Sequence, residues 1–458
     1  DPGEDVNGNG LLDPGEDDNE DANGNGLLDG PGAGIGFVVR ATGGDTTLEI
    51  GQTGLGNVFH RNVGAGIEYT LIEGGQGQVF IRDNQIRGTT AAAIDTDGDG
   101  VTDTGDGIVV RTRGDLQSGA GTPRLYNSII DGNLIGSLVT TEDTNGNSLL
   151  DPGEDINGNG LLDLSLVNEG HGVRFDIQEQ STVSNVGIGY ADAGDDSLSG
   201  NEIINNGLDG IFIERLDDAI INGLFINNNL IEGNGINQVF TDRQSALGNG
   251  ISIAARDGGD SVLGISANLN EIRGNQFNGV KLLVDGDARL QFDMFRNLVE
   301  DNGVGDLTGT NLTAGILTLE NFNSSTDKRE IIGTWSANQI VANNGYGIRF
   351  DSTATSLYNL EGEPEEFDPA MMIVGNLIDG NGLDGIEFNG MGQLLIDSND
   401  IVNNGFNADL TGAGTDDNGN GIDIQAVLLD AAGNVADQNI FPEDAETLQA
   451  ASRKIVHI

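Results

Sequence analysis

The feature that most constrains this fold is a glycine followed by an aliphatic, a variable and an apolar residue, a phrase that recurs throughout the chain. Alternation of apolar and variable residues is the pattern of a short β-strand with one buried face. The copies lie at 66–69, 107–110, 172–175, 210–213, 250–253, 279–282, 315–318, 347–350, 385–388 and 421–424. The sequence therefore predicts a series of strands whose first and third side chains after the glycine point inward.

A second phrase, rich in asparagine, precedes many of these glycines. It reads NLIDGNG at 376–382 and has relatives at 201–207 and 338–344, and a third apolar stretch often comes before it, as at 371–374. Three strands separated by Asn/Gly corners would make one triangular coil. Asparagine suits such corners because it tolerates the left-handed conformation and its amide can stack in hydrogen-bonded ladders.

The combined pattern N-x-I-x-x-N-x-x-x-G-I-x-F resembles the right-handed parallel β-helix of the pectate-lyase-like superfamily, over about residues 35–425. The resemblance implies an all-β solenoid of about ten coils and says little about activity. A β-propeller and a calcium β-roll are the alternatives. The blade signature of the first and the glycine-rich nonapeptides of the second do not occur in the sequence.

An acidic phrase of a different kind occurs twice, as DVNGNGLLDPGE at 5–16 and DTNGNSLLDPGE at 143–154. Both match the twelve-position calcium loop, in which positions 1, 3, 5, 9 and 12 offer side-chain oxygens and position 7 a backbone carbonyl. An all-Asp copy lies at 95–106, and each Glu-ended loop is followed by a partner loop. The predicted calcium ligands are Asp5, Asn7, Asn9, Leu11, Asp13 and Glu16; Asp21, Asn23, Asn25, Leu27 and Asp29; Asp95, Asp97, Asp99, Val101, Asp103 and Asp106; Asp143, Asn145, Asn147, Leu149, Asp151 and Glu154; and Asp155, Asn157, Asn159, Leu161 and Asp163.

These loops depart from the full pattern in two respects. Ser148 replaces the usual glycine at position 6, and position 12 of the partner loops is Gly32 or Leu166, so that ligand must come from elsewhere. The tandem order resembles dockerin and thrombospondin type 3 repeats but lacks the flanking helices of an EF-hand. The resemblance implies several structural Ca²⁺ ions, bound at roughly 10⁻⁴ to 10⁻³ M as in extracellular modules, and not a sensor. A solvated acidic turn is the plainer interpretation of any single loop.

The charge balance limits the kinds of molecule that this chain can bind. The chain has 73 acidic and 20 basic residues and a formal net charge of −53. Such a surface repels nucleic acid and anionic membranes, and no apolar run is long enough to span a bilayer. The absence of cysteine excludes disulfides and thiolate chemistry. Together with the calcium loops, this composition predicts an extracellular protein of a bacterial cell surface, and the start without Met or signal peptide suggests a processed product or an excerpt.

Catalysis in a β-helix would use the outward-facing residues of one sheet, where stacked side chains converge. The outward positions of the Gly-led strands are Glu68, Val109, Arg174, Phe212, Ser252, Lys281, Leu317, Arg349, Glu387 and Asp423. No carboxylate pair of the glycosidase kind is concentrated among them, and Arg349, Glu387 and Asp423 are expected to form an ion ladder. His171 lies in a GHG tripeptide similar to that of polygalacturonases, but the other segments of that family are missing, so we expect a corner residue.

The sequence thus divides into tandem calcium loops at 1–32, a β-helix at 33–425 with calcium-loop insertions at 95–106 and 143–166, and a C-terminal cap at 426–458 with a short helix at 443–452. The apolar tip at 454–458 is expected to cap its own coil or to add a strand to a neighbour. We expect a non-catalytic structural or assembly role with end-to-end or lateral self-association. The alternatives are a lyase or hydrolase of acidic polysaccharide and a non-catalytic glycan-binding adhesin.

Overall fold

The computed structural model describes residues 35–39, 45–91, 104–114, 122–137, 167–189, 200–236, 247–256, 262–286, 288–304, 313–321, 330–352, 371–390, 394–405, 421–426, 428–429, 435–436 and 456–457. The elements in these residues are all strands. Accordingly, no helix in this part of the chain could cross a membrane. The predicted helix at 443–452, and every predicted calcium ligand except Asp106, lie outside the described residues.

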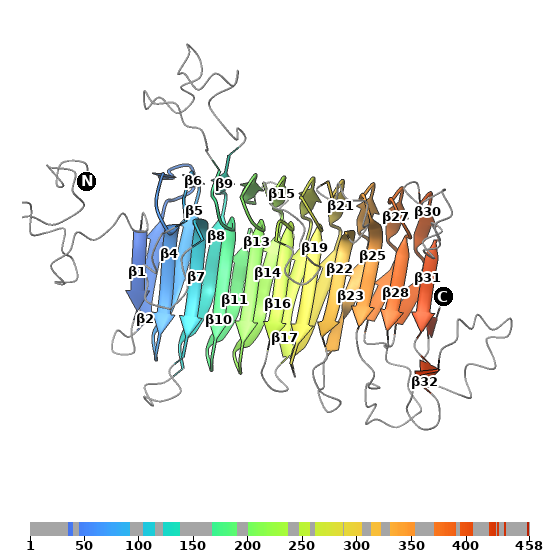
Figure 1. Ribbon diagram of the computed structural model, residues 1–458. Helices are drawn as coiled ribbons and strands as arrows, with labels where there is room; N and C mark the ends of the chain where they lie inside the picture. Colours follow the sequence, from blue (N-terminus) through green and yellow to red (C-terminus); the bar gives the residue numbers. More distant parts are fainter. Residues whose placement is uncertain are drawn as a thin grey trace, which may run out of the picture.

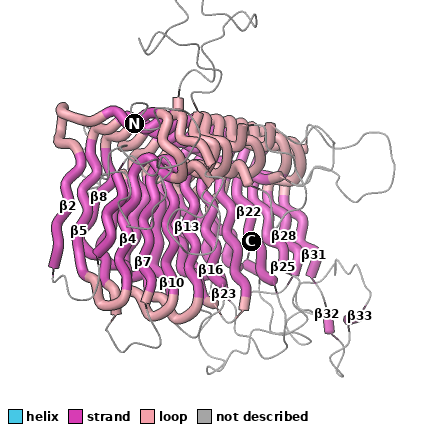
Figure 2. Tube along the Cα trace, turned by 60° about the vertical axis from the view of Figure 1, so that its left-hand side comes forward, coloured by secondary structure: helices cyan, strands magenta, loops and turns pink. Residues whose placement is uncertain are grey.

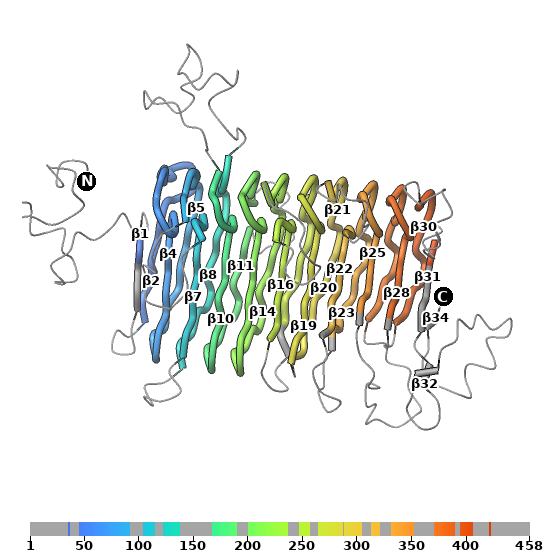
Figure 3. The backbone as a smooth tube through the Cα atoms, in the orientation of Figure 1, coloured from blue at the N-terminus to red at the C-terminus, as the bar shows by residue number. Residues whose placement is uncertain are grey.

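The strands stack into three parallel sheets, which makes the protein a parallel β-helix, as the sequence predicts (Figure 1). Each coil contributes one strand to each sheet in turn, and the coils follow one another along the axis in chain order (Figures 2 and 3). A small antiparallel pair, β32 (Leu428–Leu429) with β33 (Val435–Ala436), stands apart from the three sheets.

We call the three sheets sheet 1, sheet 2 and sheet 3. Sheet 1 consists of β1 (Ile35–Val39), β4 (Ala65–Ile72), β7 (Asp106–Arg113), β10 (Val173–Gln178), β13 (Ile211–Leu216), β16 (Ile251–Arg256), β19 (Val280–Asp285), β22 (Ala314–Asn321), β25 (Tyr346–Ser352), β28 (Ile386–Gly390) and β31 (Ile422–Ala426). Sheet 2 consists of β2 (Asp45–Ile50), β5 (Gln76–Arg82), β8 (Arg124–Asp131), β11 (Thr182–Ile188), β14 (Ile220–Asn227), β17 (Val262–Asn268), β20 (Arg289–Phe295), β23 (Glu330–Ser336), β26 (Met371–Val374), β29 (Leu394–Asp397) and β34 (Val456–His457). Sheet 3 consists of β3 (Val58–His60), β6 (Gln85–Arg87), β9 (Leu134–Gly136), β12 (Glu202–Ile204), β15 (Leu230–Glu232), β18 (Glu271–Arg273), β21 (Leu298–Glu300), β24 (Gln339–Val341), β27 (Leu377–Asp379) and β30 (Asp400–Val402).

The apolar tip of the chain pairs with its own β-helix. Val456 and His457 of β34 lie beside Leu394 and Leu395 of β29, in parallel register. Of the two outcomes expected for this tip, the structure shows the one in which it covers a coil of the same chain.

Sheet 1 is built from the Gly-led phrases. From Ile67 to Ile386, the first residue after each glycine, such as Ile251, Val280 and Ile316, is fully buried and stacks in register on its counterparts in the neighbouring coils. The glycine itself is required by the closeness of the coils: a Cβ added at Gly279 would lie 2.5 Å from Val299 Cγ1 and 2.7 Å from the carbonyl oxygen of Gly315. Real Cβ atoms do not approach a backbone this closely, so only glycine fits there.

Two columns of asparagine flank sheet 3, and we call them ladder 1 and ladder 2. In a typical link, the backbone N–H and the Nδ2 of Asn270 donate to Oδ1 of Asn297 at 3.0 and 2.9 Å, and Nδ2 also donates to the carbonyl of Ile226 at 2.7 Å. Ladder 1 runs through Asn57, Asn84, Asn133, Asn201, Asn229, Asn270, Asn297, Asn338, Asn376 and Asn399. Ladder 2 runs through Asn168, Asn206, Asn234, Asn275, Asn302, Asn343, Asn381 and Asn404. The ladders satisfy buried polar groups at the corners, where no strand pairing can do so.

The insertion that carries the predicted calcium loops at 143–166 enters at one of these corners. From β12 onward a ladder 2 asparagine stands two residues after the sheet 3 strand, and Thr89 holds that place after β6. After β9 the asparagine follows only at Asn168, beyond residues 138–166. Asn168 nevertheless fills its place: Oδ1 accepts from the Thr89 N–H at 3.1 Å and Nδ2 donates to Asn206 Oδ1 at 2.9 Å. Asn168 is therefore the first asparagine of ladder 2 and joins Thr89 in the preceding coil to Asn206 in the next.

Candidate functional site

A third column of polar residues stands immediately before the Gly-led strands of sheet 1, and we call it ladder 3. Its members are Asp106, His171, Asp209, Asn249 and Asn278, all buried. Each side chain accepts a hydrogen bond from the backbone N–H of the next member. The N–H of His171 donates to Asp106 Oδ1 at 2.6 Å, that of Asp209 to His171 Nδ1 at 3.2 Å, and that of Asn249 to Asp209 Oδ1 at 2.7 Å. The acceptors lie on the earlier coil, whereas in ladders 1 and 2 they lie on the later one.

The outward face of sheet 1 carries two columns of side chains. The first is the predicted one, from Glu68 through Arg174 to Asp423, and the strand register confirms it residue by residue. The second lies two residues further along each strand and was missed in the sequence. It consists of Thr70, Arg111, Asp176, Glu214, Ala254, Leu283, Leu319, Asp351 and Asn389.

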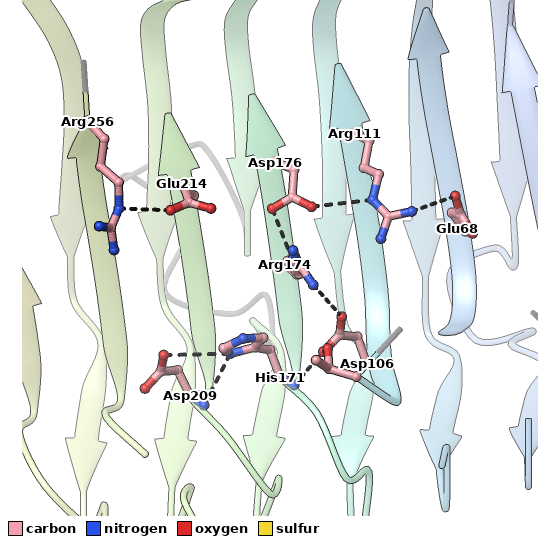
Figure 4. Close-up of polar contacts among 10 residues, drawn as sticks. Glu68, Asp106, Arg111, His171, Arg174, Asp176, Asp209, Glu214 and Arg256 are labelled. Carbon is pink, nitrogen blue, oxygen red and sulfur yellow. Dashed lines mark hydrogen bonds and ion pairs between the residues drawn. The ribbon is translucent and has the colours of Figure 1, made fainter. Parts of the chain in front are cut away.

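These columns and ladder 3 form a continuous charged network over β4, β7 and β10 (Figure 4). Arg111 contacts Glu68 Oε1 through a terminal nitrogen at 3.2 Å and Asp176 Oδ2 through Nε at 3.3 Å. Arg174 contacts the other oxygen of Asp176 at 3.0 Å and Asp106 Oδ2 at 3.6 Å. Acidic and basic groups thus alternate, and each guanidinium lies between two carboxylates.

Burial sets the protonation of this network. It raises the pKa of Asp106, which is 1% exposed, to about 6, although Arg174 and the His171 N–H act in the opposite direction. Burial also disfavours the charged form of Arg174, but Asp176 and Asp106 outweigh it and raise the pKa of that guanidinium. Removing charges from water is costly unless they are paired, so the pairing is what allows the network to remain charged.

His171 joins the network to the next coil. Its ring stacks on Phe212 at 4.6 Å between centroids, and its Nδ1 accepts from the Asp209 N–H and lies 3.6 Å from Asp209 Oδ2. Burial, and then the positive charge of Arg174, lower the pKa of His171 well below its ordinary value. Burial raises the pKa of Asp209. His171 is therefore a corner residue, as expected, and a neutral one with a defined acceptor role.

A second charged group lies on the same face, over β25 and β28. The predicted ion pair is present: Arg349 contacts Glu387 Oε2 at 3.1 Å, and its guanidinium lies 4.5 Å above the ring of Tyr346. Burial raises the pKa of Glu387, and Arg349 opposes this. The side chain of Asp423, the third predicted member of this ladder, lies outside the described residues. Between the two charged groups, an apolar cluster includes Leu283 and Leu317.

Several outward positions are buried, which the sequence did not indicate. Lys281 is 3% exposed and Leu317 is fully buried, although both point away from the core of the coils. The outward face of sheet 1 is therefore not an open surface along its middle coils.

Asp106 is the one predicted calcium ligand that can be placed. Its Oδ1 accepts from the His171 N–H and from the Thr104 hydroxyl at 2.8 Å, and its Oδ2 faces Arg174. Calcium binding at Asp106 would require these contacts to be exchanged for the metal, and a guanidinium is an unfavourable neighbour for a cation. Within the described ranges no three His, Cys, Asp or Glu side chains are grouped so that they could hold a metal ion.

Stacked coils, asparagine ladders and an internally paired charged face define the chain as a parallel β-helix protein. No protein-family model and no curated protein matches it. Among solved structures it is similar to two A-modules of Azotobacter vinelandii mannuronan C-5 epimerases. For AlgE6 the identity is 14% and the TM-score 0.29, covering 81% of this chain and 91% of that one. For AlgE4 the identity is 14% and the TM-score 0.24, covering 86% and 89%. Values this low assign neither a residue role nor an activity to this chain.

Proposed function

We propose that this chain is a calcium-stabilised structural segment of a bacterial cell surface, without catalytic activity. The observation that carries the proposal is the state of the charged side chains on the outward face of sheet 1. Arg111 and Arg174 each contact two carboxylates, and Asp106 and Asp176 are almost inaccessible to solvent. General acid–base catalysis needs groups within hydrogen-bond reach of a substrate. Groups that are buried and occupied with one another suit the stabilisation of a stack of coils.

The ladders support the same role. Each coil contacts only its neighbours, so the stability of a solenoid depends on the interfaces between successive coils. Here every interface from β12 to β30 carries a bond of ladder 1 and one of ladder 2 in addition to three strand pairings. Such repeated cross-bonding suits a stiff spacer. Calcium, an extracellular location and end-to-end or lateral self-association complete the proposal.

The assembly part of the proposal has a direct test. In calcium-containing buffer, light scattering should give particles heavier than the 47.7 kDa chain. A monodisperse monomer over the accessible concentration range would contradict self-association and leave the stiff-spacer role to be tested separately by the chain's resistance to proteolysis.

A second function, cleavage of an acidic polysaccharide, is favoured by one observation. Asp106, with its pKa near 6, contacts Arg174 and accepts from the backbone N–H of His171, whose imidazole is neutral. Perturbed groups of this kind cluster at active sites, although structural ion networks perturb them as well. Reducing-end and unsaturated-product assays on polyuronides, with and without calcium, distinguish the two. We expect no product in either condition. Product formed by the wild-type chain would overturn the non-catalytic role.

A further inference from the structure

Asn-Gly dipeptides occur in structurally different settings in the described coils. Asn206-Gly207 and Asn234-Gly235 belong to ladder 2, whereas Asn222-Gly223 lies on the outward face of sheet 2. Asn-Gly is chemically reactive because the glycine nitrogen can attack the asparagine side chain. The new N–Cγ bond closes a succinimide, the Cγ–Nδ2 bond breaks, the amide proton leaves with the amine as ammonia, and water then opens the ring to aspartate or isoaspartate.

The ladder holds its members in an arrangement that opposes this reaction. Nδ2 of Asn206 donates to Asn234 Oδ1 at 2.9 Å and to the carbonyl of Ile135 at 3.3 Å, and its side chain is fully buried. The attacking nitrogen is also occupied, because the Gly207 N–H donates to the carbonyl of Asn168 at 2.7 Å. Gly235 is held in the same way by the carbonyl of Asn206, at 2.8 Å. Ring closure would require these bonds to break and the side chain to leave the ladder.

The side chain of Asn222 lacks the restraints that the ladder imposes. It is exposed, and its side-chain amide has no hydrogen bond within the described residues. Gly223 is an extra residue relative to β17, because the register shifts between Asn222 and Leu224 while Gly264 and Ile265 are consecutive. Towards β11, Asn185 occupies the matching position between the partners of Asn222 and Leu224. The φ of Gly223 is +87°, a conformation that only glycine adopts readily. An irregularity of this kind leaves the extra residue unpaired and the chain locally bent.

We propose that Asn222 is a site of spontaneous deamidation in the folded protein, and that ladder 2 protects the Asn-Gly pairs it contains. The change places a new carboxylate on the exposed face of sheet 2 and, in the isoaspartate product, adds a methylene to the backbone of β14. This chemistry is independent of the role proposed above, because it depends only on the fold.

The test is peptide mapping of the full chain after incubation in mildly alkaline buffer. Cleavage after Arg174 and Arg215 separates the peptide containing Asn206 from the one containing Asn222 and Asn234, and fragment ions resolve the last two. If a ladder residue must first break one more hydrogen bond than Asn222, deamidation at Asn222 should be at least about tenfold faster, which corresponds to about 1.4 kcal/mol. Equal rates at Asn222, Asn206 and Asn234 in the folded chain would overturn the proposal.

Two controls connect the difference to the fold. In denaturant the three rates should converge, because the unfolded chain keeps neither the ladder nor the bulge; a difference that persists there would show that local sequence causes it. In Asn222→Gln, for which ring closure is intrinsically slow, the acidic species seen by anion exchange should decrease by the share assigned to Asn222. An unchanged amount would place the reaction at another residue and refute the assignment.

Discussion

Replacing His171 with Asn should remove a loss of stability that the wild-type chain undergoes as the pH falls below about 6.5. Burial and Arg174 lower the pKa of His171 in the folded state. Below pH 6.5 the unfolded chain therefore takes up a proton that the folded chain does not. Linkage then reduces the free energy of unfolding as the pH falls from 6.5 towards the lowered pKa.

The expected size follows from the same relation. One proton taken up only by the unfolded state costs up to about 1.4 kcal/mol per pH unit. Because the unfolded imidazole is half protonated at pH 6.5, wild type and variant should diverge by about 1 kcal/mol between pH 6.5 and 5.5. Asp106 acts in the opposite direction: its pKa rises from 3.8 to about 6 on folding, so its burial becomes less costly as the pH falls below 6. Because Asp106 is present in both proteins, its effect cancels in the comparison.

Near neutral pH the substitution should be mild. Asn249 and Asn278 already occupy ladder 3 and accept through Oδ1, so an Asn at position 171 can replace the Nδ1 acceptor. The lost stacking on Phe212 is worth about 0.5–1.5 kcal/mol. A much larger loss near pH 7.5 would mean that His171 has a structural role beyond this ladder.

Two measurements check the prediction. Trp335, the single tryptophan, is fully buried and stacks on Phe350, so its fluorescence reports urea unfolding of the later coils, and circular dichroism reports the whole β-helix. Hydrogen exchange at the Asp209 amide, which donates to His171 Nδ1, reports directly on that hydrogen bond. The reasoning fails if the free energy of unfolding depends on pH in the same way in wild type and in His171→Asn, and if the Asp209 amide is equally protected from exchange in both at pH 5.5.

Three further outcomes are expected. Arg174→Met should destabilise the chain by about 3–5 kcal/mol, because it removes the only guanidinium that contacts the buried Asp106 and leaves Asp176 with Arg111 alone among the described residues. Arg256→Met, at a 40% exposed side chain, should cost at most about 1 kcal/mol. Equal shifts in melting temperature would contradict this. Asn275→Ala should lower the free energy of unfolding by about 3 kcal/mol, because it leaves neighbouring ladder groups unsatisfied. Its control is Asn222→Ala at an exposed position, which should stay within about 0.5 kcal/mol of wild type in urea unfolding. Chelation of calcium should increase hydrogen exchange first in residues 1–32, 95–106 and 143–166, and unchanged exchange there would refute the calcium assignment.

The coil architecture could be predicted because its signals are local. Gly385, Ile386 and Phe388 form a strand pattern within four residues, and Asn376 and Asn381 mark the corners before it. The close contacts at the glycine column and the asparagine ladders then explain why the pattern repeats in every coil. A local pattern of this kind is sufficient to give the fold, since each coil repeats the same packing on the one before it.

The charged network could not be predicted to the same extent, because its contacts join residues that are distant in sequence. Asp176 and Arg111 are 65 positions apart, and the interval contains an insertion. One signal was available: both residues lie two positions beyond the outward residue of their strand, and a sheet face repeats with that period. The acceptor role of His171 depends on where the Asp209 amide comes to lie, which only the coil-to-coil register defines.

The burial of outward-facing side chains on sheet 1 could not be predicted from the sequence either. Alternation correctly places Lys281 and Leu317 outside the coils, but it does not show that both are shielded from solvent. The calcium ligands stay a prediction. Asp106, the member of that set within the described residues, has Arg174 and the His171 amide as partners, and both would compete with a metal ion.

The closure of a coil at Asn168 has a consequence for how such chains can be altered. A place in the ladder is defined by position in space, so the number of residues between β9 and the returning asparagine hardly matters to the coil. Lengthening a loop costs only about 0.6 kcal/mol per doubling, which a few ladder hydrogen bonds can offset. The segment 138–166 therefore marks a natural graft point: a foreign module with closely spaced ends could replace it, provided that the chain returns through Val167 and Asn168.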